Sequence, residues 1–396
     1  MPMNECGRCT LIAACAALTI GSRLHGQANP ARIPEATLAL QVRLGAAESG
    51  PEYEFSTVTQ VAASRRFLYV GQENMQGIRV YSSDGRYRKT IGRNGGGPGE
   101  FRELQYFSLL GDTLWTIDAG LRRTTLFSDT GRVLATSILD QLGTRRSPAS
   151  SRFYSMPVSV APNGRVVGHG ATSGQILARG EVTAYPIRSL TRGGVATDTL
   201  AWYSIANADF IVRSKRGTSY MPQPFPDHLL VAYFGAEGRA CVIDRAFSGR
   251  SPSELVNVSC VSTAKDTVWR AGLRFPARPI PARVVDSVRT RLNRALRPRF
   301  IQAEIDRALH VPRSETPIVD ALAGADGTLW LRQRESRDSS TYWVIRADGR
   351  GRKTIRVPKE LRILWANGPD VWGEEKDSDD VPRLSRYRVV DRPIRK

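Results

Sequence analysis

The sequence predicts an all-β fold, a six-bladed β-propeller, and three observations support this prediction. The segment DGRYRKTI at residues 84–91 returns as DGRGRKTI at residues 348–355, identical in seven of eight positions. A stretch at residues 44–55 aligns with residues 91–101, where two glycines and a proline match at an offset of 47. Short β-like segments alternate with tight turns along most of the chain. A period in the forties with several short strands is typical of propeller blades.

Alternating apolar residues predict the strands of the first two blades. The first blade is expected to use residues 58–62, 67–70, 78–81 and 87–91. The second is expected to use residues 104–109, 113–117, 124–127 and 133–138. Tight turns fall at Ser83-Asp84-Gly85 and Asp129-Thr130-Gly131, where glycine supplies the positive φ that a hairpin turn needs. The hairpins of these blades are therefore regular.

The middle of the chain fits the same pattern less closely. A third blade is expected between Met156 and Tyr203, with its inner hairpin turning at Asn163-Gly164. A fourth is expected after the proline-rich segment PQPFPDH, Pro222 to His228. Both lack the glycine loop, so their boundaries rest on apolar alternation alone.

Residues 281–309 break the β pattern. Apolar residues recur there at helical spacing, namely Val285, Val288, Leu292 and Leu296. Pro281 fits the first turn of a helix, and Pro298 ends or kinks it. We therefore predict one or two helices inserted between blades.

The last two blades differ in their number of strands. A fifth blade is expected at residues 318–323, 329–331, 342–345 and 353–357. The final segments supply only three strands, at residues 361–366, 370–373 and 384–389. The strand at residues 38–43 has no blade of its own, and we expect it to complete the last sheet and cover its unpaired edge. The predicted propeller therefore spans residues 37–390 and has six blades.

The first thirty residues have the order of an export signal. Arg8 precedes an apolar run from Leu11 to Ile20, and small and polar residues follow as far as Ala28. The run is too short to span a bilayer. We expect a signal peptide at residues 1–27 and a location outside the cytoplasm, periplasmic or secreted. Cys15 also follows a lipobox-like sequence, so we expect membrane association only if Cys15 is lipidated.

Two cysteines, Cys241 and Cys260, remain in the mature chain because the other three lie in the leader. A hairpin centred between Arg250 and Ser251 would place the two directly opposite each other. An oxidising compartment permits a disulfide at this distance. We predict that bridge, with a contribution of about 3 kcal/mol to stability.

The chain is strongly basic, with a formal charge of +19 from 57 Lys and Arg, of which only seven are Lys. Such a charge favours nucleic acid, anionic polysaccharide or acidic membrane surfaces. The arginines are scattered over predicted turns and strand ends, and no known nucleic-acid-binding motif accompanies them, so we expect no nucleic-acid binding. Residues 282–313 hold eight Arg against three acidic residues. We favour the interpretation that this basic face is solvated over the alternative that it binds an anionic partner.

The second blade carries a set of motif residues. A glycine loop ending in Pro-Gly-x-Phe, Gly97 to Phe101, precedes it; an aromatic strand, Trp115 to Asp118, ends in Asp; and Arg123 precedes Phe127. With these features the stretch resembles the NHL-repeat class of six-bladed β-propellers, of the exported bacterial type. The first and fifth blades match in part and the third and fourth do not. The resemblance implies the six-bladed architecture.

Two further features are interpreted as structural. Trp115, Trp330 and Trp372 fall on a central strand of three different blades, where large rings pack between sheets. The GGGPG loop at residues 95–99 does not predict a phosphate site, because Pro98 lacks an amide donor and a strand follows where a helix N-terminus is needed.

Similar propellers, such as lactonases and amidated-peptide lyases, hold metal ions at the mouth of the central channel. Blade alignment places six candidate ligands there: Glu73, Asp118, His169, Asp227, His228 and Glu374. Three or four of them would suffice for Ca²⁺ or Zn²⁺. Ordinary turn capping explains each of them separately, so we predict no cofactor and keep a channel metal as the alternative. The acidic loop at residues 374–380 is interpreted as solvated.

The motifs of common hydrolases are missing from the mature region, which has no GxSxG, HExxH or paired CxxC. We therefore expect a monomeric, non-enzymatic binding or scaffold protein that uses one propeller face for a peptide, glycan or protein partner. The alternative is a metal-dependent lactonase-like or lyase-like enzyme.

Overall fold

The computed structural model describes residues 33–45, 50–73, 75–139, 154–160, 166–172, 176, 180, 182–191, 193–234, 238–246, 251–262, 267–297, 299–334 and 339–392. All described strands and helices belong to the compact unit Pro34–Lys396. The predicted signal peptide at residues 1–27, including Cys15, and the predicted turn at Asn163-Gly164 lie outside the described residues. No helix within the described ranges is long and apolar enough to cross a membrane.

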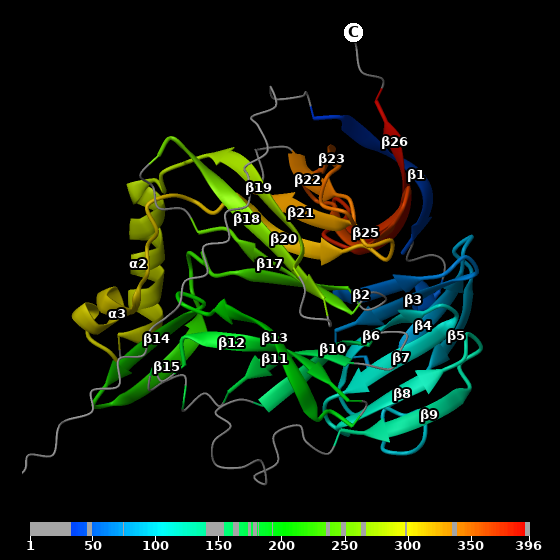
Figure 1. The fold of residues 1–396 in the computed structure, drawn as a ribbon. Helices are drawn as coiled ribbons and strands as arrows, with labels where there is room; N and C mark the ends of the chain where they lie inside the picture. The colour runs from blue at the N-terminus through cyan, green and yellow to red at the C-terminus, as the bar shows by residue number, and fades with distance from the viewer. Residues whose placement is uncertain are drawn as a thin grey trace, which may run out of the picture. The chain divides into compact units, whose positions relative to one another are not determined.

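Six antiparallel blades follow one another around a ring, which confirms the predicted fold class (Figure 1). Blades 1 and 2 consist of β2 (Val58–Ala63), β3 (Phe67–Gln72), β4 (Ile78–Ser82) and β5 (Tyr87–Ile91), then β6 (Leu104–Leu110), β7 (Thr113–Asp118), β8 (Arg123–Phe127) and β9 (Val133–Ile138). Blades 3 and 4 consist of β10 (Tyr154–Val160), β11 (Val166–Ala171), β12 (Ala184–Leu190) and β13 (Ala196–Ser204), then β16 (Leu230–Phe234), β17 (Arg239–Asp244), β18 (Ser253–Ser262) and β19 (Thr267–Pro276). Blade 5 consists of β20 (Ile318–Ala323), β21 (Leu329–Gln333), β22 (Ser339–Ile345) and β23 (Arg352–Pro358), and blade 6 of β24 (Arg362–Asn367), β25 (Asp370–Lys376), β26 (Pro382–Asp391) and β1 (Glu35–Leu44).

Each pair of neighbouring blades encloses an apolar core. Between blades 1 and 2, Tyr69 and Ile78 pack with Phe107 and Leu114. A comparable core lies between every other neighbouring pair, including blades 6 and 1. The tryptophans predicted to be core residues are at most 3% exposed, which confirms that interpretation for Trp115, Trp330 and Trp372.

The first matched glycine of each glycine loop, Gly45 in one and Gly92 in the other, has a similar geometry in both copies. Gly45 and Gly92 adopt φ values of 108° and 80°, a region that favours glycine. A Cβ atom on Gly45 would lie 3.1 Å from the Phe55 ring, and one on Gly92 would lie 2.2 Å from the Phe101 ring. The matched glycines are therefore needed because each backbone packs directly against a phenylalanine that precedes the first strand of a blade.

The N-terminal strand β1 closes the ring, as predicted. It pairs antiparallel with β26 from Ala36 opposite Asp391 to Leu44 opposite Leu384. Its first residue also pairs in parallel with blade 5, opposite Thr354 of β23. Both ends of the described chain thus lie side by side in blade 6 (Figure 1).

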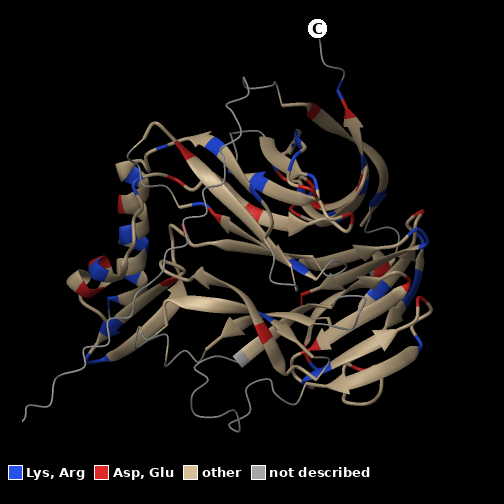
Figure 2. Ribbon diagram, in the orientation of Figure 1, with Lys and Arg blue, Asp and Glu red and all other residues tan. Residues whose placement is uncertain are grey.

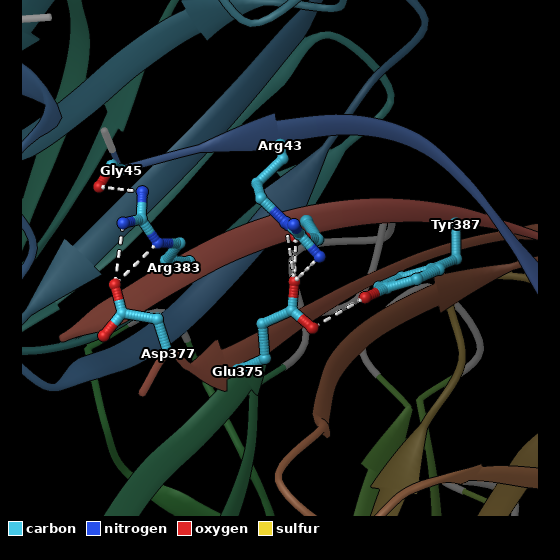
Figure 3. A network of polar contacts seen from close by, with 7 residues as sticks. Arg43, Gly45, Glu375, Asp377, Arg383 and Tyr387 are labelled. Atoms are coloured by element: carbon cyan, nitrogen blue, oxygen red, sulfur yellow. Dashed lines mark hydrogen bonds and ion pairs between the residues drawn. The ribbon is translucent and has the colours of Figure 1, made fainter. Parts of the chain in front are cut away.

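A polar network joins β1 to β26 and to β25, the next strand of the blade (Figure 3). Arg43 of β1 donates from Nε to Oε1 of Glu375 at 2.9 Å. Ser385 donates to the same oxygen at 2.8 Å, and the Tyr387 hydroxyl donates to Oε2 at 3.0 Å. Glu375 on β25 therefore joins β1 to β26.

A second arginine extends the network to the loop after β1. Arg383 donates to the carbonyl of Gly45 at 2.8 Å and to Asp377 Oδ2 at 2.7 Å (Figure 3). Bonds from the Val381 and Asp379 N–H groups and from Arg383 hold the pKa of Asp377 below its usual value. The acidic loop at residues 374–380 was expected to be solvated; instead, Glu375 and Asp377 bind arginines of the same blade.

The insertions between blades pack against each other. Helices α2 (Ala282–Leu296) and α3 (Gln302–Ala308) confirm the helical insertion predicted at residues 281–309. Sequence analysis assigned no element to the hairpin β14 (Asp209–Ser214) and β15 (Gly217–Pro222), which lies between blades 3 and 4. Phe210 and Val212 of this hairpin are buried against residues of the helical insertion, namely Leu292, Phe300 and Ile305. Figure 1 shows β14 beside α3.

Cys241 and Cys260 lie directly opposite each other on β17 and β18, as the hairpin geometry predicts. The structure joins them by a disulfide. Both are fully buried in the core between blades 4 and 5. The bridge therefore links the two middle strands of blade 4.

We predict that Glu375→Ala lowers the free energy of unfolding by about 2 kcal/mol, because three donors lose a charged acceptor. Arg43→Ala should cost less than about 1 kcal/mol, because its side chain is 49% exposed and water replaces its bonds. Denaturant titration of both single variants and the double variant measures these costs and the coupling between the two residues. A negligible cost for Glu375→Ala would contradict the role given to this network.

Candidate functional site

One face of the ring carries both insertions. Strand direction alternates within each blade, so the connection into a first strand and the connection after a second strand lie on the same face. Residues 205–229 lead into β16, and residues 277–317 lead into β20. The hairpin β14–β15 and both helices therefore lie on this face, which we call the insertion face. All six residues predicted to face the central channel belong to second strands or connections that reach it.

Asp118 caps backbone N–H groups on the insertion face. It ends β7 and is 1% exposed. Its Oδ2 accepts the Arg102 N–H at 2.8 Å. Its Oδ1 accepts the N–H groups of Glu103 and Leu121 at 3.2 and 2.8 Å. The carboxylate is therefore occupied by the chain that enters the blade and the turn that follows it.

Glu374 links blade 6 to blade 1. Its Oε1 accepts the Val58 N–H at 2.9 Å, and its Oε2 accepts a bond from Arg362 at 2.8 Å. Arg362 also donates to the carbonyl of Val58 at 2.6 Å. Blade 6 thus holds β2, the first strand of blade 1, through the carboxylate of Glu374 and the guanidinium of Arg362.

Other blades use different side chains at comparable positions. Gln72 Oε1 accepts the Ser56 N–H at 2.8 Å. Arg245 donates to the carbonyls of His228 and Ile318, each at 2.8 Å. We call the side chains that bind backbone groups at the ends of second strands the latch residues: Gln72, Asp118, Arg245, Arg334 and Glu374.

The remaining channel candidates lie in different surroundings. Burial lowers the pKa of His169 below 6.5, and its ring lies 6.3 Å from that of Tyr233. Burial, and then the charge of Arg245, lower the pKa of His228. Both imidazoles are therefore neutral at neutral pH. Glu73 is exposed.

The structure does not bring these six candidates together as ligands of one ion. No group of three or more His, Cys, Asp or Glu within the described ranges is placed to hold a metal. Asp118 and Glu374 already accept N–H and guanidinium donors, which repel a cation. The alternative of a channel metal therefore has no such cluster among the described residues, and Asp118 and Glu374 bind backbone groups, as the favoured turn-capping interpretation expects.

The motif residues of the second blade hold the glycine loop. Arg123 donates to the carbonyls of Gly97 and Glu100 at 2.6 and 2.7 Å. Glu100 in turn accepts the Gly97 N–H at 2.7 Å and pairs with Arg93 at 2.8 Å. The loop is thus fixed by its own carboxylate and by the arginine that precedes Phe127.

A groove of about 220 Å³ opens on the insertion face between α2 and the segment before β16. Residues 224–226, Pro-Phe-Pro, form one wall. Ile280, Val284 and Val288 form another, and Val284 is 39% exposed. Glu315 and Arg334 supply charged groups at the side of blade 5, 3.9 Å apart. The groove therefore combines proline and aliphatic walls with polar groups at one side, namely Glu315, Thr316 and Arg334.

Hydrogen bonds between several elements fix the walls of this groove. Asp227, which is buried, lies with Oδ2 2.8 Å from Nε2 of His310. Thr316 donates to the carbonyl of Pro226 at 3.4 Å, and Arg334 donates to the carbonyl of Thr316 at 3.2 Å. These bonds tie the proline-rich segment to the chain that follows α3. The groove is preformed, which lowers the ordering cost of binding.

Sequence reasoning did not find this groove. It treated Pro222 to His228 as a boundary and residues 281–309 as an insertion, without joining them. One feature of the sequence pointed to the groove. Val284 lies outside the apolar stripe of α2 that packs against β14, so no packing contact was predicted for its apolar side chain.

Residues 48–134 match a family described as a 6-bladed beta-propeller, and this match covers blade 1 and most of blade 2. No curated protein sequence matches the chain.

Solved structures similar to this chain are propellers of low sequence identity. A Bacteroides fragilis protein suggested to be exported is 13% identical, with 91% of this chain and 100% of that chain covered and a TM-score of 0.46. A Bacteroides vulgatus protein of a family of undefined function is 8% identical over the same shares, with a TM-score of 0.46. A streptogramin B lyase is 11% identical over 89% of this chain and 98% of that chain, with a TM-score of 0.41. Similarity at this level carries no argument about activity.

We predict that Asp118→Ala lowers the free energy of unfolding by at least about 2 kcal/mol, because three N–H groups lose their acceptor. Glu73→Ala is the matched control, because Glu73 is exposed and should change stability by less than about 0.5 kcal/mol. Denaturant midpoints measure both effects. If Asp118→Ala left stability unchanged but removed a bound ion from the purified protein, Asp118 would be a metal ligand and not a latch residue.

Proposed function

We propose that this chain is an exported binding protein that holds a short peptide segment in the groove on its insertion face. The observation that carries the proposal is the groove itself, a preformed apolar depression of about 220 Å³ with an exposed valine on its wall. Binding sites for small ligands and side chains are typically concave and apolar, with a few placed polar groups. The volume suits one large apolar side chain or two small ones.

The lining favours a peptide over a glycan. Sugar rings stack on exposed aromatic faces and need many hydrogen-bonding partners, whereas the walls here are built mostly of proline and aliphatic side chains, with Phe225 as the aromatic residue. A peptide can place an apolar side chain between these walls and direct its backbone or charged groups to Glu315 and Arg334.

The alternative of a metal-dependent lactonase-like or lyase-like enzyme gains no support from the described residues. Two of its proposed ligands, Asp118 and Glu374, accept hydrogen bonds from backbone N–H groups of the ring. The apolar groove also lies away from those two residues, among a different set of side chains.

Location outside the cytoplasm is part of this proposal. It is supported by the signal-like order of residues 1–27 and by the disulfide between Cys241 and Cys260, a bond that persists in oxidising compartments.

Selection from a random peptide library displayed on phage tests the proposed function. The wild-type protein should enrich peptides that share an apolar position, and Val284→Asp should not, because it places a charge on the groove wall. This variant should still fold, since an aspartate is favourable in the first turn of α2. Val268→Asp is the control, because Val268 is 46% exposed on the outer strand of blade 4.

Two results would contradict the proposed function. One is a wild-type selection that returns no shared sequence. The other is enrichment of the same peptides by Val284→Asp.

A further inference from the structure

Helix α2 has two sides with different charge. On one side, Asp286 and Arg289 lie 3.5 Å apart, and Arg289 also lies 3.7 Å from Asp306 of α3. Those charges neutralise one another within the insertion. On the other side lie Arg283, Arg291 and Arg294, which we call the arginine stripe.

The arginine stripe is an exposed group of basic side chains. All three arginines are exposed, and none has an ion-pair partner in the part of the chain that the structure describes. Asp286 is the sole acidic residue of α2 and is paired with Arg289. Figure 2 shows the basic residues along α2 beside the acidic ones of α3. The stripe therefore presents positive charge that no ion pair among the described residues compensates.

The arginine stripe borders the apolar groove. At 3.6 residues per turn, Arg291 lies about 20° around the helix axis from Val284, which lines the groove. Arg291 is also one turn after Val288, another lining residue. From Arg283 to Arg294 the stripe runs about 17 Å along the helix, the length of about five residues of an extended peptide.

We propose that the ligand of the groove is an acidic peptide, with an apolar side chain held between α2 and residues 224–226 and several Asp or Glu residues laid along the arginine stripe. This inference rests on the proposed function and adds the charge class of the peptide. Charge complementarity carries it: a ligand that fills the groove lies beside Arg291, and Arg283 and Arg294 lie farther around the exposed side of the same helix, where guanidinium groups can bind carboxylates in bidentate geometry.

A peptide explains these features better than an anionic surface does. A lipid surface or a polysaccharide would be drawn by the arginine stripe alone and would not need a recessed apolar groove beside it. The groove and the arginine stripe lie side by side on one helix, so one ligand that combines an apolar anchor with acidic residues engages both.

Fluorescence anisotropy of the full mature protein with three labelled peptides of equal length tests this inference. The first has a leucine followed by Asp and Glu residues, the second has the same leucine followed by Ser and Gln residues, and the third has Gly in place of leucine before the acidic residues. The first should bind about tenfold or more tightly than either of the others, and its affinity should fall as salt rises.

Charge reversal on α2 provides the matched variants. Arg283→Glu with Arg291→Glu should weaken binding of the acidic leucine peptide by about tenfold or more. Arg65→Glu with Arg356→Glu makes the same change in net charge at exposed arginines of blades 1 and 5, and should leave the affinity within about twofold.

Each of the following outcomes would contradict the inference and identify the reason. If the neutral leucine peptide binds as tightly as the acidic one, the inference fails while the proposed function stands. If the acidic peptide without leucine, or vesicles rich in phosphatidylglycerol, bind equally well to the wild type and to Val284→Asp, the arginine stripe serves a general polyanion. If both charge-reversed pairs weaken binding equally, only net charge matters. If none of the peptides binds, the acidic-peptide inference fails.

Discussion

The pairing of β1 with β26 is the constraint on which the rest of the structure depends. Blades 1 to 5 are each made from consecutive strands, whereas blade 6 takes three strands from one end of the chain and one from the other. Without β1, the edge of β26 would lie open, and the core between blades 6 and 1 would lose Leu44 and Val42, which pack with Trp372 and Phe55. The buried face of β1 specifies the register of this closure, and the arginine and carboxylate contacts around Glu375 add to it.

A closed ring turns the insertion face into a rigid platform. The latch residues bind backbone groups where blades 1, 2, 4 and 5 begin, so their polar atoms hold the ring, and of the latch residues Arg334 alone also lines the groove. The two insertions supply those parts. They bring apolar walls and positive charge together at α2. The hydrogen bond between Asp227 and His310 keeps the segment before β16 in place.

The sequence predicted the ring because its signals are local and repeated. Gly45 and Gly92 occupy one geometry twice, and the seven-of-eight match at residues 84–91 and 348–355 marks equivalent outer strands. The β14–β15 hairpin was missed because Phe210 and Val212 are buried by helices far along the chain, and nothing local separates them from blade strands. The role of the channel candidates was left open between two uses, because a carboxylate at a strand end, such as Asp118, can bind either an ion or backbone N–H groups. The sequence favoured turn capping, and the structure shows that Asp118 accepts backbone N–H groups. The groove needs four segments that are separate in sequence, so no single stretch predicted it.

Native-state hydrogen exchange of the unmodified protein tests the closure most directly. The backbone amides of β1 and β26 that pair with each other should exchange at the same slow rate as the inner strands of blades 5 and 1, because opening that sheet requires opening the ring. Fast exchange along β1, with the other blades still protected, would show that the ring stands without its N-terminal strand and would contradict this account.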